Sequence, residues 1–266
     1  MSRVRAAILM AVTALFGAGA ARAHVGFLLP NDFSPEAGQQ VTVVAAFTDT
    51  FPNAEIALKS DGFALVLPDG DVRPLAPAAT LPAMSVLEAK PEAPGTYRIT
   101  TGERLGRKGE VVVIDGHYVR IGDGGIARDD VPDGAAILTS QTATVSDAFI
   151  AVPGNALAPP APGQGRLVLR PTTHPAALTA GAQFDVDVLF DGKPLKGAAV
   201  TLMAAYGHYT HPDGIALNAD DCGTVSVEGI EPGVYVLMVR HMAEAPSGGE
   251  TDLRSYTTAL TLEVRP

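Results

Sequence analysis

Most apolar residues of this chain fall in short runs that are rich in β-branched side chains and end at Gly, Pro, Asn or Asp. The segment FDVDV at residues 184–188 alternates strictly, which is typical of a strand with one buried and one solvated face. The same reasoning predicts strands at residues 41–47, 63–67, 96–100, 110–114, 117–121, 166–169, 184–190, 198–204, 224–227, 234–239 and 257–264. A short helix is expected around residues 84–89.

The spacing of these runs predicts an all-β protein built from two antiparallel β-sandwich domains. Turn sequences such as PDG at residues 68–70 and DGKP at residues 191–194 separate the runs and favour hairpins over β-α-β units. A segment rich in Pro, Ala and Gly at residues 156–165 is typical of a linker. We therefore predict an amino-terminal domain at residues 24–165 and a carboxy-terminal domain at residues 166–266.

Residues 1–23 have the pattern of a cleaved signal peptide. Arg3 and Arg5 precede an apolar stretch at residues 6–18, and the sequence Ala-Arg-Ala at residues 21–23 is a cleavage site directly before His24. We expect export to the periplasm. The remaining chain has no apolar run of membrane-spanning length and no cysteine after the cleavage site, so neither membrane insertion nor a lipid anchor is expected.

The formal net charge of the chain is −10. Removal of residues 1–23 would take away three arginines and no acid, which lowers the net charge to −13. This balance argues against nucleic acid as a partner and is compatible with attraction of cations. Cys222 is the only cysteine, so no intrachain disulfide can form.

Catalytic motifs are missing from the sequence. It contains no G-x-S-x-G nucleophile elbow, no H-E-x-x-H zinc motif and no phosphate-binding glycine loop ahead of a helix. We therefore predict that the protein is not an enzyme.

Histidines provide the candidate chemistry. Cleavage before His24 would free an α-amine on the same residue as the imidazole, and the two nitrogens together can chelate one metal ion. His208 and His211 form an H-x-x-H pair that a turn before Pro212 can bring together. His241 follows a predicted strand at the rim of a sheet. We predict a metal site made of His24, His208, His211 and His241.

Two further histidines are interpreted as structural or solvated. His174 precedes Pro175 at the predicted domain junction, and His117 follows a turn at the start of a predicted strand. The sequence leaves open whether either of them takes part in metal binding.

The mature chain resembles an exported bacterial family catalogued as domain of unknown function 4198, some of whose members are linked to nickel uptake. The resemblance rests on HVGFLLP at residues 24–30, GQGRLVL at 163–169, THP at 173–175 and PGVYVLMVRH at 232–241. The second half, with DGKPLKGAAV at residues 191–200, is similar to transthyretin-like sandwiches. The turn ADDCG at residues 219–223 departs from the family pattern, which implies only a changed turn.

Together these features predict a periplasmic protein that binds a divalent transition metal, nickel or cobalt first and copper as an alternative, and assists its uptake or delivery. A membrane metal transporter is the expected partner. Two other functions remain open: an interaction module of the cell envelope without metal, and a copper protein with an amino-terminal histidine, as carrier or, least favoured, as an oxidative enzyme.

Overall fold

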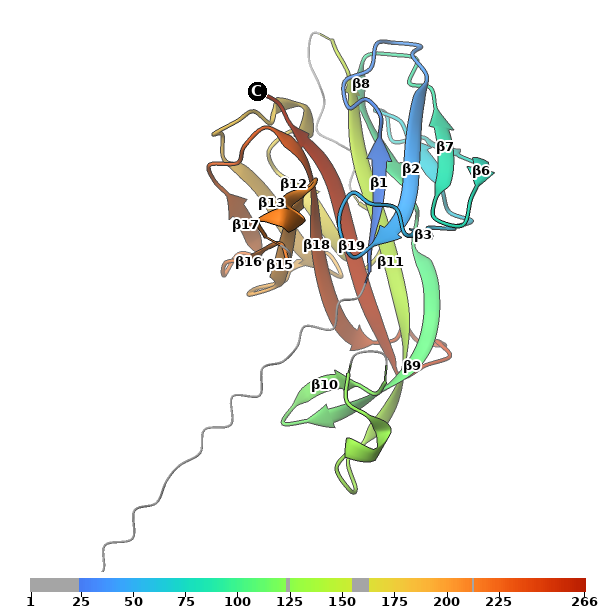
Figure 1. Ribbon diagram of the computed structural model, residues 1–266, viewed down its shortest axis with the longest axis vertical. Coiled ribbons are helices and arrows are strands. Elements are labelled where there is room, and N and C mark those ends of the chain that lie inside the picture. The colour runs from blue at the N-terminus through green and yellow to red at the C-terminus, as the bar shows by residue number, and fades with distance from the viewer. Residues whose placement is uncertain (1–23, 123–124, 155–162, 212) are drawn as a thin grey trace, which may run out of the picture.

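The computed structural model describes residues 24–122, 125–154, 163–211 and 213–266. The predicted signal peptide and most of the predicted linker lie outside these residues. The described chain is an all-β protein, as the sequence pattern predicted, and its helical content is limited to three short 3₁₀ turns (Figure 1): η1 (Arg128–Asp130), η2 (Pro175–Ala177) and η3 (Gly207–Tyr209). None of the described residues forms a helix long and apolar enough to cross a membrane.

The described strands form three sheets. A five-stranded sheet contains β1 (Val25–Pro30), β2 (Val41–Thr48), β3 (Ile56–Ala57), β6 (Pro77–Thr80) and β7 (Ser85–Ala89). A four-stranded sheet contains β12 (Leu167–Pro171), β13 (Phe184–Phe190), β14 (Lys193–Pro194) and β17 (Thr224–Val227). The largest, ten-stranded sheet contains β4 (Ala64–Val66), β5 (Val72–Pro74), β8 (Gly95–Thr100), β9 (Arg104–Ile114), β10 (His117–Arg120), β11 (Ile137–Val152), β15 (Ala199–Ala204), β16 (Ile215–Asn218), β18 (Gly233–Glu244) and β19 (Leu253–Val264).

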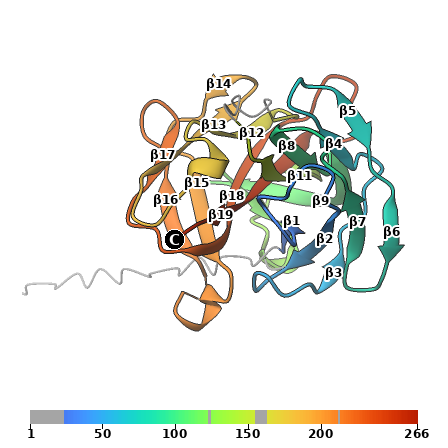
Figure 2. The ribbon, with the colours of Figure 1, turned by 90° about the horizontal axis from the view of Figure 1, so that it is seen from above.

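The ten-stranded sheet runs through both halves of the chain. Its centre is a parallel pair, in which Ser140 to Ala148 of β11 lie beside Leu253 to Thr261 of β19. The strand order β16-β15-β18-β19 belongs to the second half, and β11-β8-β4-β5 belongs to the first. Figure 2 shows the two halves side by side with these strands between them. The sandwiches are therefore not purely antiparallel, because the last strand returns to pair with the first half.

Each half nevertheless has its own hydrophobic core. In the first half, Leu28, Leu87 and Ile150 belong to a cluster between the five-stranded sheet and the large sheet. In the second half, Val186 and Leu237 belong to a cluster between the four-stranded sheet and the large sheet. The predicted boundary at residue 165 falls between β11 and β12, although Ala143 and Phe149 of β11 pack into the core of the second half. Independent folding of the halves stays a prediction.

A third apolar cluster joins the halves and fixes the start of the described chain. Val25 and Phe27 of β1 pack with Val236 of β18 and Ala259 of β19. Phe51, in the loop after β2, meets Phe27 edge-on with ring centroids 5.2 Å apart. This packing anchors both the first residues of β1 and the loop between β2 and β3.

The expected helix around residues 84–89 is wrong, because these residues form β7. Side chains of β7 alternate between buried and half-buried positions, and the strand pairs with β2 on one side and with β6 on the other. Alternating burial against neighbouring strands overrides the weak helical preference of its Leu, Glu and Ala residues.

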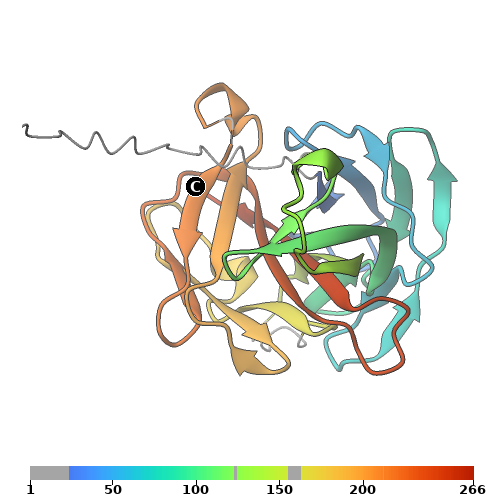
Figure 3. The same cartoon turned by 90° about the horizontal axis from the view of Figure 1, so that it is seen from below.

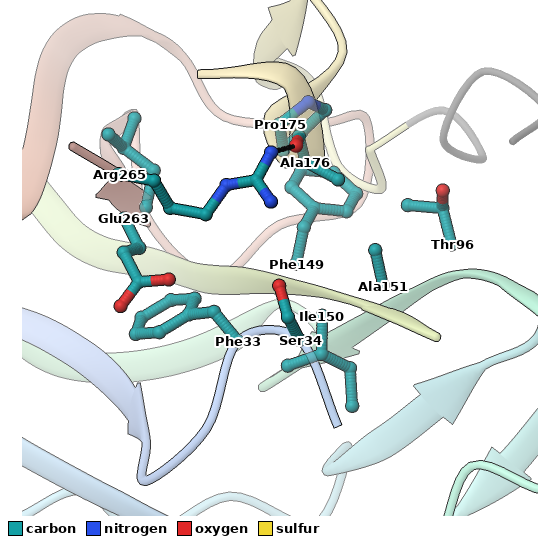
Figure 4. Close-up of a pocket in the computed structure, with 11 residues that line it drawn as sticks. Phe33, Ser34, Thr96, Phe149, Ile150, Ala151, Pro175, Ala176, Glu263 and Arg265 are labelled. Carbon is teal, nitrogen blue, oxygen red and sulfur yellow. Dashed lines mark hydrogen bonds between the residues drawn. The ribbon is translucent and has the colours of Figure 1, made fainter. Parts of the chain in front are cut away.

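A narrow pocket lies at the junction of the two halves, on the far side from the start of β1. Figure 4 shows Phe33, Phe149 and Glu263 around it, with the Arg265 guanidinium donating a hydrogen bond to the Ala176 carbonyl oxygen. Its volume is about 10 Å³, which is room for one water molecule. At this volume the pocket is too small to enclose a ligand larger than water.

Candidate metal centre at the start of β1

His24 immediately precedes β1 and meets the residue that follows β2. In the antiparallel pairing, Val25 lies opposite Thr48, so the next step of the register sets His24 beside Asp49. The distance from His24 Nδ1 to Asp49 Oδ1 is 2.8 Å. Strand pairing therefore brings an imidazole and a carboxylate together although 24 residues separate them along the chain.

Glu55 completes the group from the other side of β2. The short strand β3 returns beside β2 with Ile56 opposite Phe47, which places Glu55 near Asp49. Its Oε1 atom accepts hydrogen bonds from the hydroxyls of Thr48 and Thr50 and from the backbone N–H of Asp49, at 3.1 to 3.3 Å. Its Oε2 atom lies 3.8 Å from His24 Nδ1. One oxygen of Glu55 is thus held in place and the other faces the imidazole.

The three side chains form the one group of potential metal ligands found among the described residues. Ligand atoms of His24, Asp49 and Glu55 all lie within 4.8 Å of one another. His24 Nδ1 and Asp49 Oδ1 are shielded from water, yet their alignment is not that of a hydrogen bond despite the short distance. An ion pair would need a protonated imidazole. A neutral imidazole nitrogen and a carboxylate oxygen that share no hydrogen bond can each offer a lone pair to a cation.

A pocket beside Asp49 brings in two more of the predicted histidines. It has a volume of about 50 Å³, and its lining includes Asp49, Phe51, Met203, His208 and His211. The backbone N–H of Tyr206 donates to the Phe51 carbonyl oxygen at 3.2 Å, which holds the two loops together. Figure 3, seen from below, shows the orange loop after β15 projecting from the edge of the molecule, while the green β9–β10 hairpin crosses its middle.

The loop after β15 explains how His208 and His211 come to face one pocket. The backbone N–H groups of Thr210 and His211 both donate to the Gly207 carbonyl oxygen, which turns the chain at η3. The His208 ring packs on Tyr209 with centroids 4.2 Å apart, and its Nδ1 atom is shielded from water without a hydrogen bond in the described chain. Asp49 therefore lies beside His24 and shares a pocket with His208 and His211. Pro212 lies outside the described residues.

His241 is not brought to this group. On β18 it shares a face with Leu237 and Val239, which pack into the second core, whereas Val236 and Met238 face β1. Its ring lies 4.5 Å from that of Phe190. Burial, together with the positive charge of Arg166, holds the pKa of His241 below its usual value.

Arg240, the neighbour of His241 on β18, interacts electrostatically with Asp49 of the candidate centre. Burial and the positive charge of Arg120 lower the pKa of Arg240, while attraction to Asp49 opposes this shift. Alternation along β18 puts Arg240 on the face of Val236 and Met238, which pack toward β1, and His241 on the opposite face.

The two remaining histidines lie elsewhere. His174 Nδ1 accepts a hydrogen bond from the backbone N–H of Ala176 at 3.1 Å, and its Nε2 atom is 2.8 Å from the Thr96 hydroxyl. This is the structural role at the junction that the sequence suggested. His117 is exposed at the start of β10.

Asp49 and Glu55 were missed by the sequence analysis. They stand in the loop between β2 and β3, and no short spacing motif links them to His24. Only the pairing of β1 and β3 on opposite edges of β2 brings them together. An imidazole nitrogen and carboxylate oxygens are borderline to hard donors that suit zinc, nickel, cobalt or copper in the divalent state.

Comparisons with known proteins show the family but no activity. A family model described as "Domain of unknown function (DUF4198)" matches residues 21–243. No curated protein gives a significant match.

Solved structures give only remote likenesses. The D0-D1 domain of intimin is 10% identical over 89% of this chain and 97% of its own, with a TM-score of 0.22. The FN1-FN3 domains of chicken CNTN1 are 9% identical over 91% and 99%, with a TM-score of 0.24. Activated alpha-2-macroglobulin of Escherichia coli is 15% identical over 90% of this chain and 20% of its own, with a TM-score of 0.23.

Proposed function

The chain belongs to the family described as "Domain of unknown function (DUF4198)", and we propose that it binds one divalent transition-metal ion at His24, Asp49 and Glu55. The observation that carries this proposal is the shielded pair of His24 Nδ1 and Asp49 Oδ1, which lie 2.8 Å apart without hydrogen-bond geometry. Glu55 Oε2 supplies a third donor at 3.8 Å from the imidazole nitrogen.

Signal-peptide cleavage before His24 would add a fourth donor. The α-amine and Nδ1 of one histidine close a six-membered ring around a metal ion, whereas Nε2 points away from its own backbone. Nδ1 is the nitrogen that faces the two carboxylates. A chain that starts at His24 therefore offers two nitrogens and two oxygens, a set that suits Ni(II), Co(II) and Cu(II).

His208 and His211 extend the site on the other side of Asp49. Both line the same pocket as Asp49, and His208 Nδ1 lacks a hydrogen bond in the described chain. We propose that they complete the coordination or accept the ion during transfer. His241 has no part in this centre because it lies on the opposite face of β18.

For the organism, the proposed role is periplasmic capture of nickel or cobalt and delivery to a membrane metal transporter. The site favours this over catalysis, because it is partly open, with side-chain exposures of 38% for His24 and 32% for Asp49, and allows exchange of the ion. A copper protein with an amino-terminal histidine is the second candidate. The amine-imidazole chelate supports it equally.

Metal titration of the exported protein tests the proposal. Mass spectrometry should first show His24 as the first residue, and isothermal titration with Ni(II) should then give one ion per chain. X-ray absorption of the nickel form should show nitrogen and oxygen ligands without sulfur. Tight Cu(II) binding alone would not identify the cargo, since copper binds most strongly to such ligands in general. A correctly processed protein that binds none of these ions would contradict the proposal.

A further inference from the structure

The strand β16 ends the ten-stranded sheet on the side of the second half. It pairs with β15 along one edge, with Leu202 opposite Ile215 and Ala199 opposite Asn218. No described strand pairs with its other edge. Figure 2 shows β16 at the outer side of the second half, next to β17 of the smaller sheet.

The pairing with β15 decides which backbone groups of β16 point outward. The N–H of Ala219 donates to the Ala198 carbonyl oxygen at 2.9 Å. Hydrogen-bonded and non-hydrogen-bonded positions alternate in an antiparallel pair, so Leu217 and Ile215 also direct their backbone groups toward β15. Ala216 and Asn218 therefore direct their N–H and C=O groups away from the sheet.

The strand β16 is short, like β5 at the opposite end of the same sheet, but it lacks two features that protect β5. There, β5 carries Arg73 and Pro74, a charge and a residue without an N–H donor. Both features discourage a foreign strand from pairing. The sequence IALN of β16 contains no charge and no proline, and Ile215 leaves 43% of its surface exposed.

Charges at both ends of β16 limit what can pair with it. Asp213 precedes the strand, and Asp220 and Asp221 follow it, all three exposed. Lys196 is bound to Asp221 at 2.7 Å, so the three carboxylates and this one ammonium group carry a formal net charge of −2. In a second copy paired antiparallel with Ala216 opposite Asn218, Asp213 would lie opposite Asp221. This repulsion disfavours self-pairing and favours a partner strand with basic ends.

We propose that the β16 edge binds an extended segment of another protein, with four to five uncharged residues flanked by lysine or arginine, by strand addition to the ten-stranded sheet. Main-chain hydrogen bonds to Ala216 and Asn218 supply the affinity, and the acidic flanks select the basic ends. Because Ile215 also lines the pocket of His208 and His211, the bound segment lies beside the proposed metal site. The pairing itself does not depend on metal.

A peptide titration in the presence of a chelator tests this edge apart from the metal. The probe is an acetylated, fluorescein-labelled peptide of sequence KKTVTVTKK, measured by fluorescence anisotropy with the mature protein. Ala216→Pro removes the outward N–H without removing a hydrogen bond to β15, and Ala216→Ser, which keeps that N–H, is the matched control. We expect the proline variant to bind at least tenfold more weakly and the serine variant to bind as the parent does.

Further measurements decide between possible occupants. A peptide with glutamate in place of each lysine should bind at least tenfold more weakly, and backbone amide shifts caused by the basic peptide should centre on residues 215–218. Circular dichroism should show that Ala216→Pro keeps the fold. Absence of binding at 1 mM peptide, or equal binding by both variants, would overturn the proposal. So would a dimer in sedimentation equilibrium that Ala216→Pro dissociates, because the occupant would then be a second copy.

Discussion

His24 and His241 both lie near a carboxylate, but their surroundings differ in how the charges are satisfied. Near His241, the Arg166 guanidinium binds both oxygens of Asp191 at 2.6 Å and stacks on Phe190 at 4.6 Å. Both carboxylate oxygens of Asp191 in that cluster therefore already accept a hydrogen bond from Arg166. At the start of β1, two carboxylates face one imidazole, and the shortest contact lacks hydrogen-bond geometry.

The comparison teaches that proximity of histidine and acid does not identify a metal site. A histidine beside a saturated ion pair contributes packing, as His241 does against Phe190. A histidine beside carboxylates with unused lone pairs can share a cation with them. The predictions below separate the two clusters.

The largest expected effect is loss of metal binding when the amino-terminal chelate is removed. His24→Ala in the mature protein should weaken Ni(II) binding by well over tenfold, or more than about 1.4 kcal/mol. Adding one glycine before His24 keeps the imidazole but moves the α-amine, and should also weaken binding at least tenfold. Competition with a chromogenic chelator measures both, and His117→Ala is the control with an exposed histidine. Unchanged Ni(II) affinity in His24→Ala and in the chain with the added glycine, with the fold intact, would show that the His24 cluster does not differ from the His241 cluster in metal binding.

The carboxylates should contribute less than the chelate. Asp49→Asn and Glu55→Gln each keep the size of the side chain and remove a charged donor, so each should weaken Ni(II) binding about three- to tenfold. Asp191→Asn in the other cluster should leave the affinity unchanged. The same titrations measure all three variants. If Asp191→Asn lost more Ni(II) affinity than Asp49→Asn, the metal site would lie in the His241 cluster and not at the start of β1.

In the His241 cluster the expected effect is on stability. Arg166→Ala removes the bonds to Asp191, the Glu244 carbonyl oxygen and the Tyr256 hydroxyl, together with stacking on two rings. The pair is partly exposed, so the free energy of unfolding should fall by only about 1–2 kcal/mol. His241→Ala should cost about 1 kcal/mol through the lost contact with Phe190. Urea unfolding measures both variants, and neither should change Ni(II) affinity by more than twofold.

The smallest expected effect is a pH dependence of stability. Because the pKa of His241 is lower in the folded protein than its usual 6.5, the unfolded chain takes up a proton first as the pH falls below 6.5. Stability from this residue is fully present above pH 6.5 and decreases as the pH falls toward the folded-state pKa. His241→Phe should flatten the unfolding free energy between pH 6.5 and 5 in metal-free protein. If the slope of the unfolding free energy against pH stayed unchanged in His241→Phe, other groups would cause the pH dependence.

Most strands could be predicted from the sequence, and the strands that were missed have identifiable physical reasons. Residues 184–190 alternate clearly and form β13 with those bounds. β11 was missed although it is the longest strand described, because its burial changes from one-sided to two-sided along its length and removes the alternation. Its neighbours β8, β9 and β19 cause that change.

The candidate site was predicted in part. The sequence singled out His24, His208 and His211, and the structure sets all three around the loop after β2. It also singled out His241 and missed Asp49, Glu55 and Arg240. A single residue step along β18 separates His241 from Arg240, and the sequence pattern did not reveal which of the two faces β1.

The sequence by itself determined that the chain is an all-β protein, because apolar alternation and turn residues act locally. Only the tertiary structure decided that a parallel pair of β11 and β19 joins the two halves, and that His24, Asp49 and Glu55 meet. Strand register and the face on which a side chain lies depend on partners far along the chain. The imidazole of His24 meets the two carboxylates because β1 and β3 pair with β2, and no spacing motif in the sequence indicates this.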